Sequence, residues 1–446
     1  MSPLEACLCR HASACPDRLA LVCGPVELSY AQLWQAVCRR MDSLSAAGLH
    51  AGEAWVCRAS QSAEFLTTYL AVHALGGVMV PLEQSLPDVA FDEIRTAMRA
   101  ASIPEGTADI LFTTGTTGRS RGVMISHEAI RANAENLIEA QGFTSGLMFV
   151  ISGPLNHIGS LSKVWPVIRT GGALCVLEGM KDLNAFYASL SRPGFHFATF
   201  LVPSAIRMLL AFSGGELSSY AGVIDFIETG AAPIRQEDME ELCRVLPHSR
   251  LYNTYASTET GIVCTHDFNR PGCRIAGCLG RPMKHARIRI TPDGTVACQG
   301  PMLMTGYVDD PEQTASVLRE GRVLFTHDKG EIDAEGRLHL IGRSDDVINV
   351  GGYKVDPSEV EAVAAGLPDV ADCVCVRASH PVMGTVLKLL VVPAEGCVLD
   401  RKKIARHIRS RLELYKVPAL YEAVQAIEYT YNGKINRKAY RDKHEG

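Results

Sequence analysis

The sequence predicts an α/β protein with a large N-terminal domain of layered sheets and helices and a small α+β C-terminal domain. At 446 residues the chain is longer than one ordinary hydrophobic core supports, so more than one domain is expected. Short β-rich runs alternate with helix-compatible segments through most of the chain, which is typical of α/β folds. After Arg343 this pattern changes. We therefore expect a large domain over 1–343 and a small domain over 344–446.

The first elements are predicted to be two helices and a strand. Ser29 and Gln32 form a capping box, after which apolar residues recur at helical spacing. A second apolar helix over 63–75 runs into Gly76 and the strand-like run 78–82. Further β-rich runs, separated by helix-compatible segments such as 204–212, follow at 109–114, 173–178, 196–203 and 223–230. The pattern predicts layers of sheets and helices.

Beyond Arg343 the sequence predicts a separate small domain. Asp356 is a helix N-cap with Pro357 at the first helical position, and two strand-like runs and a basic helix over 401–412 follow. About a hundred residues with their own strands and helices are enough for such a domain. Because no low-complexity linker separates the two parts, we expect a short hinge near 343–346.

The composition is that of a globular protein and argues against nucleic-acid or membrane partners. Hydrophobic residues make up 47% and charged residues 21%, and the net charge of −5 gives no general attraction to nucleic acid or anionic lipid. No apolar stretch reaches the ~18 residues of a membrane span, and the start lacks the apolar core of a secretion signal. The 15 cysteines are scattered. We expect a cytoplasmic protein with reduced cysteines that acts on a small molecule.

A Thr- and Gly-rich segment over 113–122, TTGTTGRSRG, is the sharpest local signal. It follows a strand-like run and precedes a helix that begins near His127. Its glycines allow backbone N–H groups to approach a polyanion closely, and its hydroxyls and arginines supply further donors. No GK[ST] sequence closes it, so it is not a P-loop. Alone, such a loop is as often a surface turn as a phosphate site.

Further segments, in a fixed order, strengthen the phosphate interpretation. They are GAAP (230–233), NTYASTE (253–259), GPMLMTGYVDDPEQT (300–314), THDKGE (326–331), GRSDDVINVGGYKVDPSEVE (342–361) and NGKINRK (432–438). From about Ser29 to Lys438 the chain resembles the adenylate-forming superfamily of acyl-CoA synthetases, nonribosomal-peptide adenylation domains and luciferases. In size it is similar to compact aryl- or acyl-CoA ligases such as the o-succinylbenzoate-CoA ligases. The resemblance implies αβαβα layers, a small β subdomain and a mobile C-terminal domain.

The resemblance also implies a two-step reaction and its cofactors. ATP and a carboxylic acid give acyl-AMP and pyrophosphate, with Mg²⁺ bound by Glu259, and a thiol then takes the acyl group. The residues expected to bind ATP and AMP are Thr113, Thr114, Gly115, Thr116, Thr117, Gly118 and Arg121 at the phosphates, Gly230, Ala231, Ala232 and Asn253 at the adenine, Thr258 at the α-phosphate, Asp328 and Arg343 at the ribose, and Tyr255, Ala256 and Ser257 elsewhere in the nucleotide site.

Lys434 is predicted to carry adenylation, with Thr258, Glu259 and His157 as the other catalytic residues. The substrate carboxylate and the α-phosphate are both anionic, and two unit charges ~4 Å apart repel by roughly 4 kcal/mol at an effective dielectric constant of about 20. A bridging ammonium from Lys434 offsets this repulsion. The resemblance further places a hinge at Asp345 and a thiol-delivery loop at Gly351, Gly352 and Tyr353.

The acid is expected to be an aryl or short acyl acid rather than an amino acid. Amino-acid-activating relatives place an aspartate for the substrate ammonium at the start of the segment that corresponds to 153–165, and this chain has none there. Lys163 in that segment is interpreted as a solvated lysine, with contact to a second substrate carboxylate as the alternative. The residues expected to line the acid pocket are His157, Gly159, Ser160, Val202, Gly230, Ala256, Ser257 and Ile262.

The acceptor of the acyl group stays open between coenzyme A and an acyl or peptidyl carrier protein. Both present the same phosphopantetheine thiol, and the basic run 401–409 fits nucleotide phosphates, an acidic carrier protein or solvent alone. A homodimer is also left open. The chain departs from relatives at Arg121, Ala256 and His327, and in the short stretch between 87 and 113. A degenerate, non-catalytic nucleotide-binding protein is therefore the second class of function considered.

Overall fold

The computed structural model consists of two compact units. The described residues are 3–113, 121–275, 277–343, 348–350, 353–380, 384–412, 414–430, 433–437 and 439–440. The large unit comprises Met1–Arg289, Ala297–Phe325 and Asp333–Leu338, and the small unit comprises Ile290–Val296, Thr326–Ile332 and His339–Gly446. Two segments before position 339 thus belong to the small unit, whereas the sequence analysis placed a single boundary after Arg343. The predicted hinge at Asp345 lies outside the described residues.

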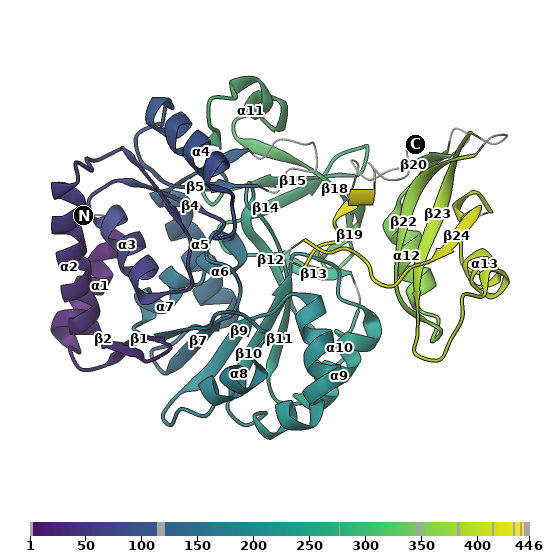
Figure 1. Ribbon diagram of the computed structural model, residues 1–446, viewed down its shortest axis with the longest axis horizontal. Coiled ribbons are helices and arrows are strands. Elements are labelled where there is room, and N and C mark those ends of the chain that lie inside the picture. Colours follow the sequence, from purple (N-terminus) through teal and green to yellow (C-terminus); the bar gives the residue numbers. More distant parts are fainter. Residues whose placement is uncertain are drawn as a thin grey trace. The chain divides into compact units, whose positions relative to one another are not determined.

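The main sheet of the large unit is a run of parallel strands flanked by antiparallel ones (Figure 1). In spatial order its strands are β13 (Cys278–Pro282), β12 (Gly261–Asp267), β11 (Arg250–Ser257), β10 (Ile224–Gly230), β9 (His196–Phe200), β7 (Leu147–Ile151), β8 (Ala173–Val176), β1 (Leu19–Cys23) and β2 (Val26–Ser29). The pairing is parallel from β11 to β1. Every residue of β7 and β8 is buried, as expected for parallel strands covered on both faces. The strands predicted within 173–178, 196–203 and 223–230 are confirmed.

A second sheet contains the strands on both sides of the Thr- and Gly-rich loop. Its strands, in spatial order, are β16 (Gly306–Tyr307), β6 (Gly122–Ser126), β5 (Thr107–Phe112), β4 (Val78–Leu82) and β3 (Ala54–Arg58). Strands β3, β4 and β5 are parallel, and β5 and β6 form an antiparallel hairpin. The strands predicted within 78–82 and 109–114 are confirmed, and the hairpin fixes both ends of the loop.

Helices cover and separate the two sheets. The outer face of the main sheet packs against α8 (Leu183–Ser189), α9 (Pro203–Ser219) and α10 (Gln236–Val245), and the outer face of the second sheet packs against α4 (Asp88–Ala100). The middle layer contains α1 (Pro3–Ala14), α2 (Tyr30–Ala46), α3 (Ala63–Ala74), α5 (His127–Gln141) and α7 (Val164–Thr170). Helix α5 contacts β12 of one sheet and β6 of the other, and α3 contacts β1 and β4. This is the αβαβα order that the resemblance implied (Figure 1).

The helix starts follow local sequence signals. Ser29 and Gln32 form the predicted capping box at α2: the Gln32 N–H donates to the Ser29 hydroxyl, and the Ser29 N–H donates to the Gln32 side chain. Ser126 accepts a hydrogen bond from the backbone N–H of Ala129 and thereby caps α5. This cap ends β6 and starts the helix directly, so the strand after the loop and α5 are continuous.

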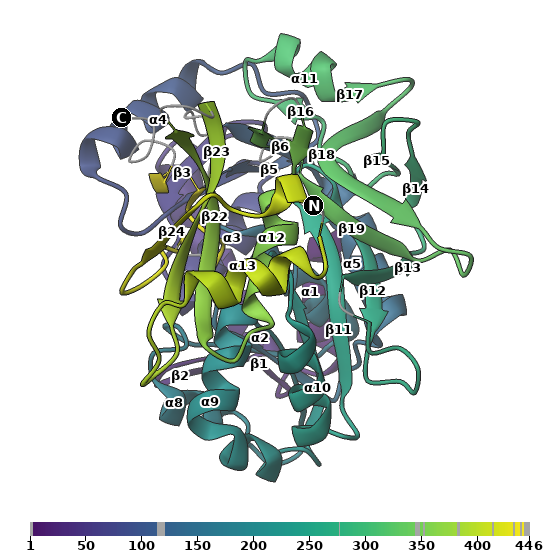
Figure 2. The ribbon, with the colours of Figure 1, turned by 90° about the vertical axis from the view of Figure 1, so that its right-hand side faces the viewer.

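The small unit contains a three-stranded sheet with two helices on one face (Figure 2). Its elements include β20 (Ile348–Val350), β21 (Tyr353–Val355), α12 (Pro357–Ala365), β22 (Val370–His380), β23 (Gly384–Pro393), α13 (Arg401–Arg409), the 3₁₀ turn η1 (Leu414–Lys416) and β24 (Leu420–Ala423). Asp356 caps α12 as predicted. Cys373 and Cys375 point from β22 into the core beneath α12 and α13, where they pack as small apolar residues.

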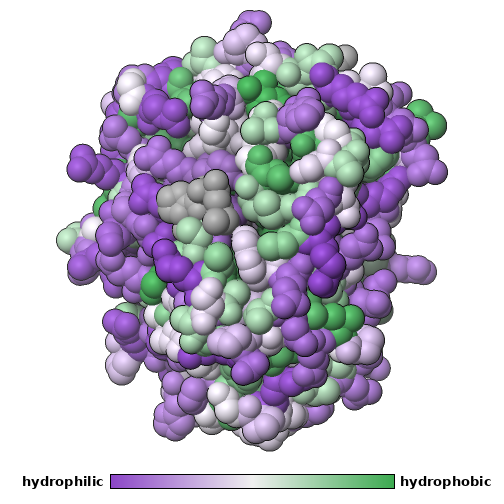
Figure 3. Space-filling model, turned by 90° about the vertical axis from the view of Figure 1, so that its left-hand side faces the viewer, coloured by the Kyte–Doolittle hydropathy of each residue, from purple (hydrophilic) through white to green (hydrophobic). Residues whose placement is uncertain are grey.

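The remaining elements are short or divided between the units. Strands β14 (Arg287–Ile290), β15 (Thr295–Gln299), β18 (Val323–Ile332) and β19 (Leu338–Arg343) have residues in both units, and α6 (Ile158–Leu161), α11 (Pro311–Val317) and β17 (Leu318–Arg319) belong to the large one. Among the described residues, no helix has the length and apolar character that a bilayer crossing requires. The side on which α1 and α2 lie shows hydrophilic residues around its edge and apolar residues toward its middle (Figure 3). All 15 cysteines are free thiols, as predicted.

Candidate active site

The β5–β6 hairpin closes the base of the predicted phosphate loop. Phe112 pairs with Gly122 across the hairpin, and the backbone N–H of Thr113 donates to the carbonyl of Arg121 at 3.0 Å. A Cβ at Gly122 would lie 3.0 Å from Ile110, so the strand packs tightly at this point. The structure therefore holds the first and last residues of the loop together. The predicted phosphate-binding residues Thr114, Gly115, Thr116, Thr117 and Gly118 lie outside the described residues.

Arg121 and Glu259 both contact Tyr307, which connects the loop to the predicted Mg²⁺ ligand. The guanidinium carbon of Arg121 lies 5.7 Å from the centre of the Tyr307 ring, and its Nε lies 4.0 Å from an oxygen of Asp310. The Tyr307 hydroxyl donates to Oε1 of Glu259 at 3.2 Å. Burial raises the pKa of Tyr307, and the nearby Glu259 carboxylate raises it further, so the hydroxyl remains a donor at neutral pH. We call these three residues the phosphate corner.

Tyr307 was missed by the sequence analysis although it lies in the quoted segment 300–314. A tyrosine in a Gly-Tyr pair carries no local sign of which side chain it will meet. The signal that could have identified it is the strand pairing of 306–307 with 123–124, which brings the tyrosine beside the loop.

A tight turn between β11 and β12 positions Thr258 and Glu259. Ser257 and Thr260 bracket the turn through mutual hydrogen bonds of 2.9–3.1 Å, and the N–H of Met304 donates to the Glu259 carbonyl at 2.9 Å. Gly261 follows with φ of +66°, and a Cβ there would lie 2.6 Å from the carbonyl oxygen of Met302. Only glycine fits this position without strain, so the turn has one well-defined conformation.

Helix α5 holds this turn in place. Asn133 accepts a hydrogen bond from the Ile262 N–H at 2.7 Å, and Asn136 donates to the Ile262 carbonyl at 3.1 Å. Both asparagines are buried, where a paired amide is strongly favoured over an unpaired one. The helix that directly follows the phosphate hairpin thus also fixes the segment that bears Glu259. The sequence analysis gave Asn133 and Asn136 no role.

The predicted adenine residues gather at the carboxyl ends of β10 and β11. Gly230 ends β10 opposite Thr254, and a Cβ there would lie 2.7 Å from the Thr254 carbonyl oxygen. Ala231 follows with φ of +68°, an uncommon backbone conformation for a non-glycine residue that often marks a functional turn. The carboxyl ends of parallel strands are the usual binding edge of such sheets. Asn253 is buried and donates from Nδ2 to the Cys278 carbonyl at 3.0 Å, and its predicted contact with adenine stays a prediction.

The other residues predicted for the nucleotide site lie near these strand ends. Tyr255 is buried in β11, Ala256 pairs with Ile262 at a bulge, and Ser257 ends the strand. Ala232 follows the Ala231 turn and is partly buried. The structure brings these residues into one region of the large unit, beside the turn that bears Thr258 and Glu259.

The ring of Phe200 joins two parts of the predicted acid pocket. A Cβ at Gly159 would lie 3.0 Å from this ring, and a Cβ at Gly230 would lie 3.6 Å from it. His157 is partly buried just before α6, and Val202 is partly buried just before α9. Both glycines therefore lie close to the edge of one aromatic ring. Phe200 ends β9 and lies beside two residues predicted for the pocket, although it was given no role from the sequence.

Two further pocket residues are buried within the same unit. Ser160 lies in α6, and its hydroxyl would meet a Cβ placed at Gly153. Ile262 is buried at the start of β12, held by the asparagines of α5. Their predicted contact with the acid stays a prediction.

The interpretation of Lys163 as a solvated lysine is wrong. Its side chain is 0% exposed, and its Nζ lies 2.7 Å from Oε2 of Glu228, whose side chain is 1% exposed. The ammonium also lies 5.6 Å from the centre of the Phe200 ring. Because the turn between α6 and α7 faces the main sheet, the lysine points inward and its charge is compensated by Glu228.

Residues predicted to bind the ribose belong to the small unit. Asp328 is buried in β18 at 8% exposure, and its backbone N–H donates to the Thr326 hydroxyl at 3.1 Å. His327 points to the opposite face of the same strand and is exposed. Alternation along the strand therefore separates the two side chains. Arg343 ends β19.

A turn on the small unit presents Lys434 to solvent. Tyr429 and Ile435 form an antiparallel bridge, and Thr430 accepts from and donates to the backbone of Lys434. Gly433, with φ of +77°, makes the reversal possible. Lys434 is exposed near the end of this turn, which we call the lysine turn (429–430 and 433–435).

Arg437 anchors the chain just after the lysine turn. Its two terminal nitrogens each lie 2.8 Å from an oxygen of Glu361 in α12, and the N–H of Cys375 donates to the same carboxylate at 2.8 Å. Burial raises the pKa of Glu361, and the guanidinium of Arg437 opposes the rise. A forked ion pair fixes direction as well as distance, so it orients the segment that bears Lys434.

The predicted thiol-delivery loop is only partly within the described residues. Gly351 and Gly352 lie outside them, and Tyr353 begins β21, paired with Val350. The roles predicted for this loop therefore stay predictions.

The chemistry of the large unit fits Mg²⁺ and a nucleotide. Glu259 has one carboxylate oxygen in a hydrogen bond to Tyr307, and its remaining lone pairs suit a hard cation that prefers one or two carboxylates with phosphate oxygens and water. The close approach of Gly230 to the neighbouring strand leaves backbone rather than side chain at the edge where a flat base would lie. The arrangement can bind a phosphorylated nucleotide and place cationic charge beside it.

Comparisons with known proteins agree with this geometry. A family model described as AMP-binding enzyme matches residues 8–104 and 95–308, and one described as AMP-binding enzyme C-terminal domain matches 359–434. The chain is 26% identical to an indoleacetate–CoA ligase of Aromatoleum aromaticum, over 97% of this chain and 96% of that protein. It is 26% identical to a feruloyl-CoA synthase of Amycolatopsis sp., over 96% of each. A 4-coumarate-CoA ligase of Narcissus pseudonarcissus is 26% identical over 80% of this chain and 66% of that protein.

Solved structures share the fold. ATP-bound MatB from Rhodopseudomonas palustris aligns with a TM-score of 0.87 at 23% identity, over 98% of each chain. The o-succinylbenzoate CoA synthetase MenE from Bacillus subtilis, solved with its acyl-adenylate, aligns with a TM-score of 0.84 at 22% identity, over 98% of each chain. At these identities the likeness shows the fold alone.

Proposed function

Because the chain belongs to the AMP-binding enzyme family, we propose that it is an acid–thiol ligase that activates a carboxylic acid with ATP and passes the acyl group to coenzyme A. The observation that carries the proposal is the phosphate corner, in which Arg121 and Glu259 both contact Tyr307 at the base of the predicted phosphate loop. A degenerate nucleotide binder has no need of a metal-binding carboxylate held in one orientation. The retention of this corner therefore favours an enzyme.

In the first half-reaction a carboxylate oxygen of the acid attacks the α-phosphorus of ATP. The bond from that phosphorus to pyrophosphate breaks, and acyl-AMP forms. Bound Mg²⁺ neutralises phosphate charge, and Glu259 is the residue that would hold it. Arg121 contributes positive charge at the base of the loop, and Lys434 is proposed to bridge the attacking carboxylate and the α-phosphate. Tyr307 orients Glu259 through its hydrogen bond.

In the second half-reaction the thiol sulfur attacks the acyl carbonyl carbon. The bond from that carbon to the AMP oxygen breaks, AMP leaves, and the thiol gives up its proton. Because Lys434 and the predicted thiol-delivery loop both lie after 343, the two steps require different positions of the small domain about the hinge proposed at Asp345. His157 is proposed to line the route of the thiol.

An aryl acid is the proposed substrate class. Three relatives that align over 80% or more of the chain are named for indoleacetate, feruloyl and 4-coumarate substrates. The Phe200 ring lies beside Gly159 and Gly230, two residues predicted for the acid pocket, and an aromatic substrate ring is proposed to pack near it. Since these relatives are named as CoA ligases or synthases, coenzyme A is preferred over a carrier protein as acceptor. Because the proposed reaction uses ATP and coenzyme A, the protein is proposed to act in the cytoplasm.

Pyrophosphate release tests the proposal directly. The full-length protein is incubated with ATP, Mg²⁺ and a panel of aryl, dicarboxylic and fatty acids, and ATP–pyrophosphate exchange is measured. We expect exchange with aryl acids and thioester formation when coenzyme A is added. Absence of exchange with every acid, in a protein that still binds ATP, would identify a non-catalytic nucleotide binder. Exchange without a CoA thioester, but with acylation of a carrier protein, would identify the carrier protein as the acceptor in place of coenzyme A.

A further inference from the structure

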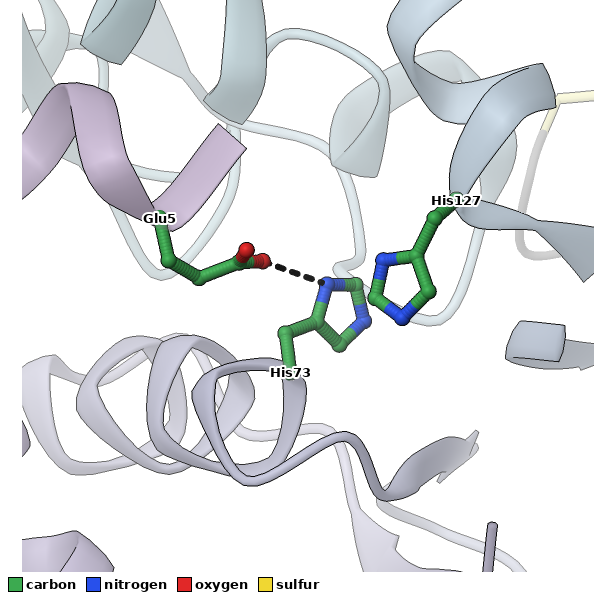
Figure 4. Close-up of side chains that lie close together, drawn as sticks. All are labelled: Glu5, His73 and His127. Carbon is green, nitrogen blue, oxygen red and sulfur yellow. Dashed lines mark ion pairs between the residues drawn. The ribbon is translucent and has the colours of Figure 1, made fainter. Parts of the chain in front are cut away.

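A buried carboxylate and two imidazoles meet where three helices of the large unit come together. Figure 4 shows Glu5 of α1, His73 of α3 and His127 of α5 pointing toward one another. One potential ligand atom from each lies within 4.8 Å of the other two. The side chain of Glu5 is 1% exposed, that of His73 is 0% exposed, and His127 is partly buried. Neither the phosphate corner nor the predicted acid pocket uses these residues.

A second layer of hydrogen bonds orients His73. Its Nε2 lies 2.8 Å from Oδ1 of Asp109, which suits donation from the ring to the carboxylate. The other oxygen of Asp109 accepts from the Tyr69 hydroxyl at 3.2 Å, and the Trp165 indole N–H donates to that hydroxyl at 3.1 Å. With the proton on Nε2, the Nδ1 of His73 presents a lone pair toward Glu5 and His127. A carboxylate behind a histidine in this way is the usual support of a metal-binding imidazole.

Oε1 of Glu5 and the Nδ1 atoms of His73 and His127 make no hydrogen bonds with one another. The Nδ1 of His73 lies 3.8 Å from Oε1 of Glu5, beyond hydrogen-bond distance. The Nδ1 atoms of His73 and His127 are both buried, and within the described part of the chain neither has a hydrogen-bond partner. Buried acceptors that face one another are unfavourable unless a cation lies between them. We propose that Glu5, His73 and His127 bind one divalent transition-metal ion, with Zn²⁺ as the best-suited cation.

The donor set and spacing favour zinc over a hard cation. Two imidazoles and one carboxylate are typical of zinc sites, whereas Mg²⁺ and Ca²⁺ prefer oxygen ligands. Zinc with its ligands at ~2.0–2.1 Å in a tetrahedron places them roughly 3.3 Å apart. Glu5 and His73 lie 3.8 Å apart and all three ligand atoms lie within 4.8 Å of one another, so shifts of up to about 1.5 Å would bring them to this spacing. The fourth position is left for a water molecule.

The position of the site gives it a structural role near the catalytic loop. Asp109 lies in β5 and His127 directly follows β6, so both strands of the phosphate hairpin contribute to the cluster or its support. The remaining ligands bring in α1 and α3. A bound ion would therefore fasten the N-terminal helix to the base of the hairpin, on the side away from the loop.

Metal analysis of the untagged protein tests this proposal. We expect about one zinc ion per chain after purification without chelators, measured by inductively coupled plasma mass spectrometry. Removal of the metal with a chelator should lower the Tm by several degrees, and added Zn²⁺ should restore it, because an ion that binds only the folded state stabilises it. The readout does not depend on catalysis. A zinc-free protein whose Tm is unchanged by added Zn²⁺ overturns the proposal and leaves the cluster a metal-free packing arrangement in which Asp109 orients His73.

Matched variants locate the ion. His127→Gln and Glu5→Gln should each lose most of the zinc, whereas His50→Gln, at an exposed position outside the cluster, should retain it. His127 is only partly buried, so its substitution is the milder test of folding. Co²⁺ added to the chelator-treated wild type should give the visible absorption of a tetrahedral site, and His127→Gln should abolish it. Zinc that persists in both cluster variants places the ion elsewhere and contradicts the assignment.

Discussion

The phosphate corner and the lysine turn present charge in opposite ways. Glu259 lies on a turn fixed by the glycine conformation of Gly261 and by hydrogen bonds from a neighbouring helix. Lys434 is exposed on the lysine turn. The ion pair of Arg437 with Glu361 holds the chain just after this turn. The first arrangement preorganises Glu259, which is proposed to hold Mg²⁺. The second exposes a long side chain to solvent, which suits the role proposed for Lys434 in only one of the two half-reactions.

The largest expected effect comes from removing the lysine. Lys434→Ala should reduce acyl-AMP formation by ~10²–10³-fold while the Kd for ATP changes little, because the ammonium is proposed to act on the transition state. Thioester formation from supplied acyl-AMP should be retained. Lys402→Ala, on the exposed face of α13, is the control. Adenylation near the wild-type rate in Lys434→Ala would contradict the catalytic role proposed for Lys434.

Removing the negative charge of Glu259 should also lower the rate of adenylation. Glu259→Gln keeps the size and the hydrogen bond to Tyr307 but loses the charge that holds Mg²⁺, so we expect roughly a 100-fold loss in adenylation and a shift of the Mg²⁺ dependence to higher concentration. The exposed Glu312→Gln in α11 is the matched control. An unchanged Mg²⁺ dependence in Glu259→Gln would argue that the metal is held by other residues.

The anchor of the lysine turn is predicted to act on orientation. Arg437→Lys keeps the charge but loses the forked contact with Glu361, so we expect about a tenfold lower rate of adenylation with thioester formation less affected. Arg437→Ala, which leaves Glu361 without its partner, should additionally destabilise the small unit by about 3 kcal/mol, measured as a lower Tm. Equal loss of both half-reactions in a fully folded Arg437→Lys would show that the anchor does not specifically orient Lys434.

The smallest effect is expected at the tyrosine between Arg121 and Glu259. Tyr307→Phe removes one hydrogen bond worth about 1 kcal/mol, which corresponds to roughly a fivefold lower rate of adenylation. The apolar ring remains, so the Tm should stay close to that of the wild type. Tyr220→Phe, whose hydroxyl contacts Ser191 on the outer layer, serves as the control. A loss as large as that of Glu259→Gln would mean that the corner depends on the tyrosine more than on the carboxylate.

Local signals were sufficient for most elements of the fold. The capping box at Ser29, the N-cap at Asp356 and the strands around the loop are determined by residues adjacent in sequence, and the structure confirms them. The residues that complete the site are determined by distant pairing. Asn133 forms a hydrogen bond with Ile262, and Tyr307 forms one with Glu259. The partners in each pair lie far apart in the sequence, so no periodic pattern predicts their contact.

Lys163 shows why charge alone misleads. A lone lysine is usually solvated, so the sequence favoured that interpretation, but Glu228 compensates the ammonium in a fully buried pair. Neither residue carries a local sign of the other. The same reason hides the cluster of Glu5, His73 and His127, whose members come from three separate helices.

Because β6 continues directly into α5, the predicted phosphate loop and the turn that bears Glu259 are structurally coupled. Strand β6 follows the predicted phosphate loop and ends at Ser126, which caps α5. Asn133 and Asn136 of α5 form hydrogen bonds with the backbone of Ile262. Local opening of this part would release the loop and the Glu259 turn together, as a single cooperative unit. Amide hydrogen exchange should then give a shared opening rate for 122–126 and 261–263, and a nucleotide that slows exchange in one should slow it equally in the other.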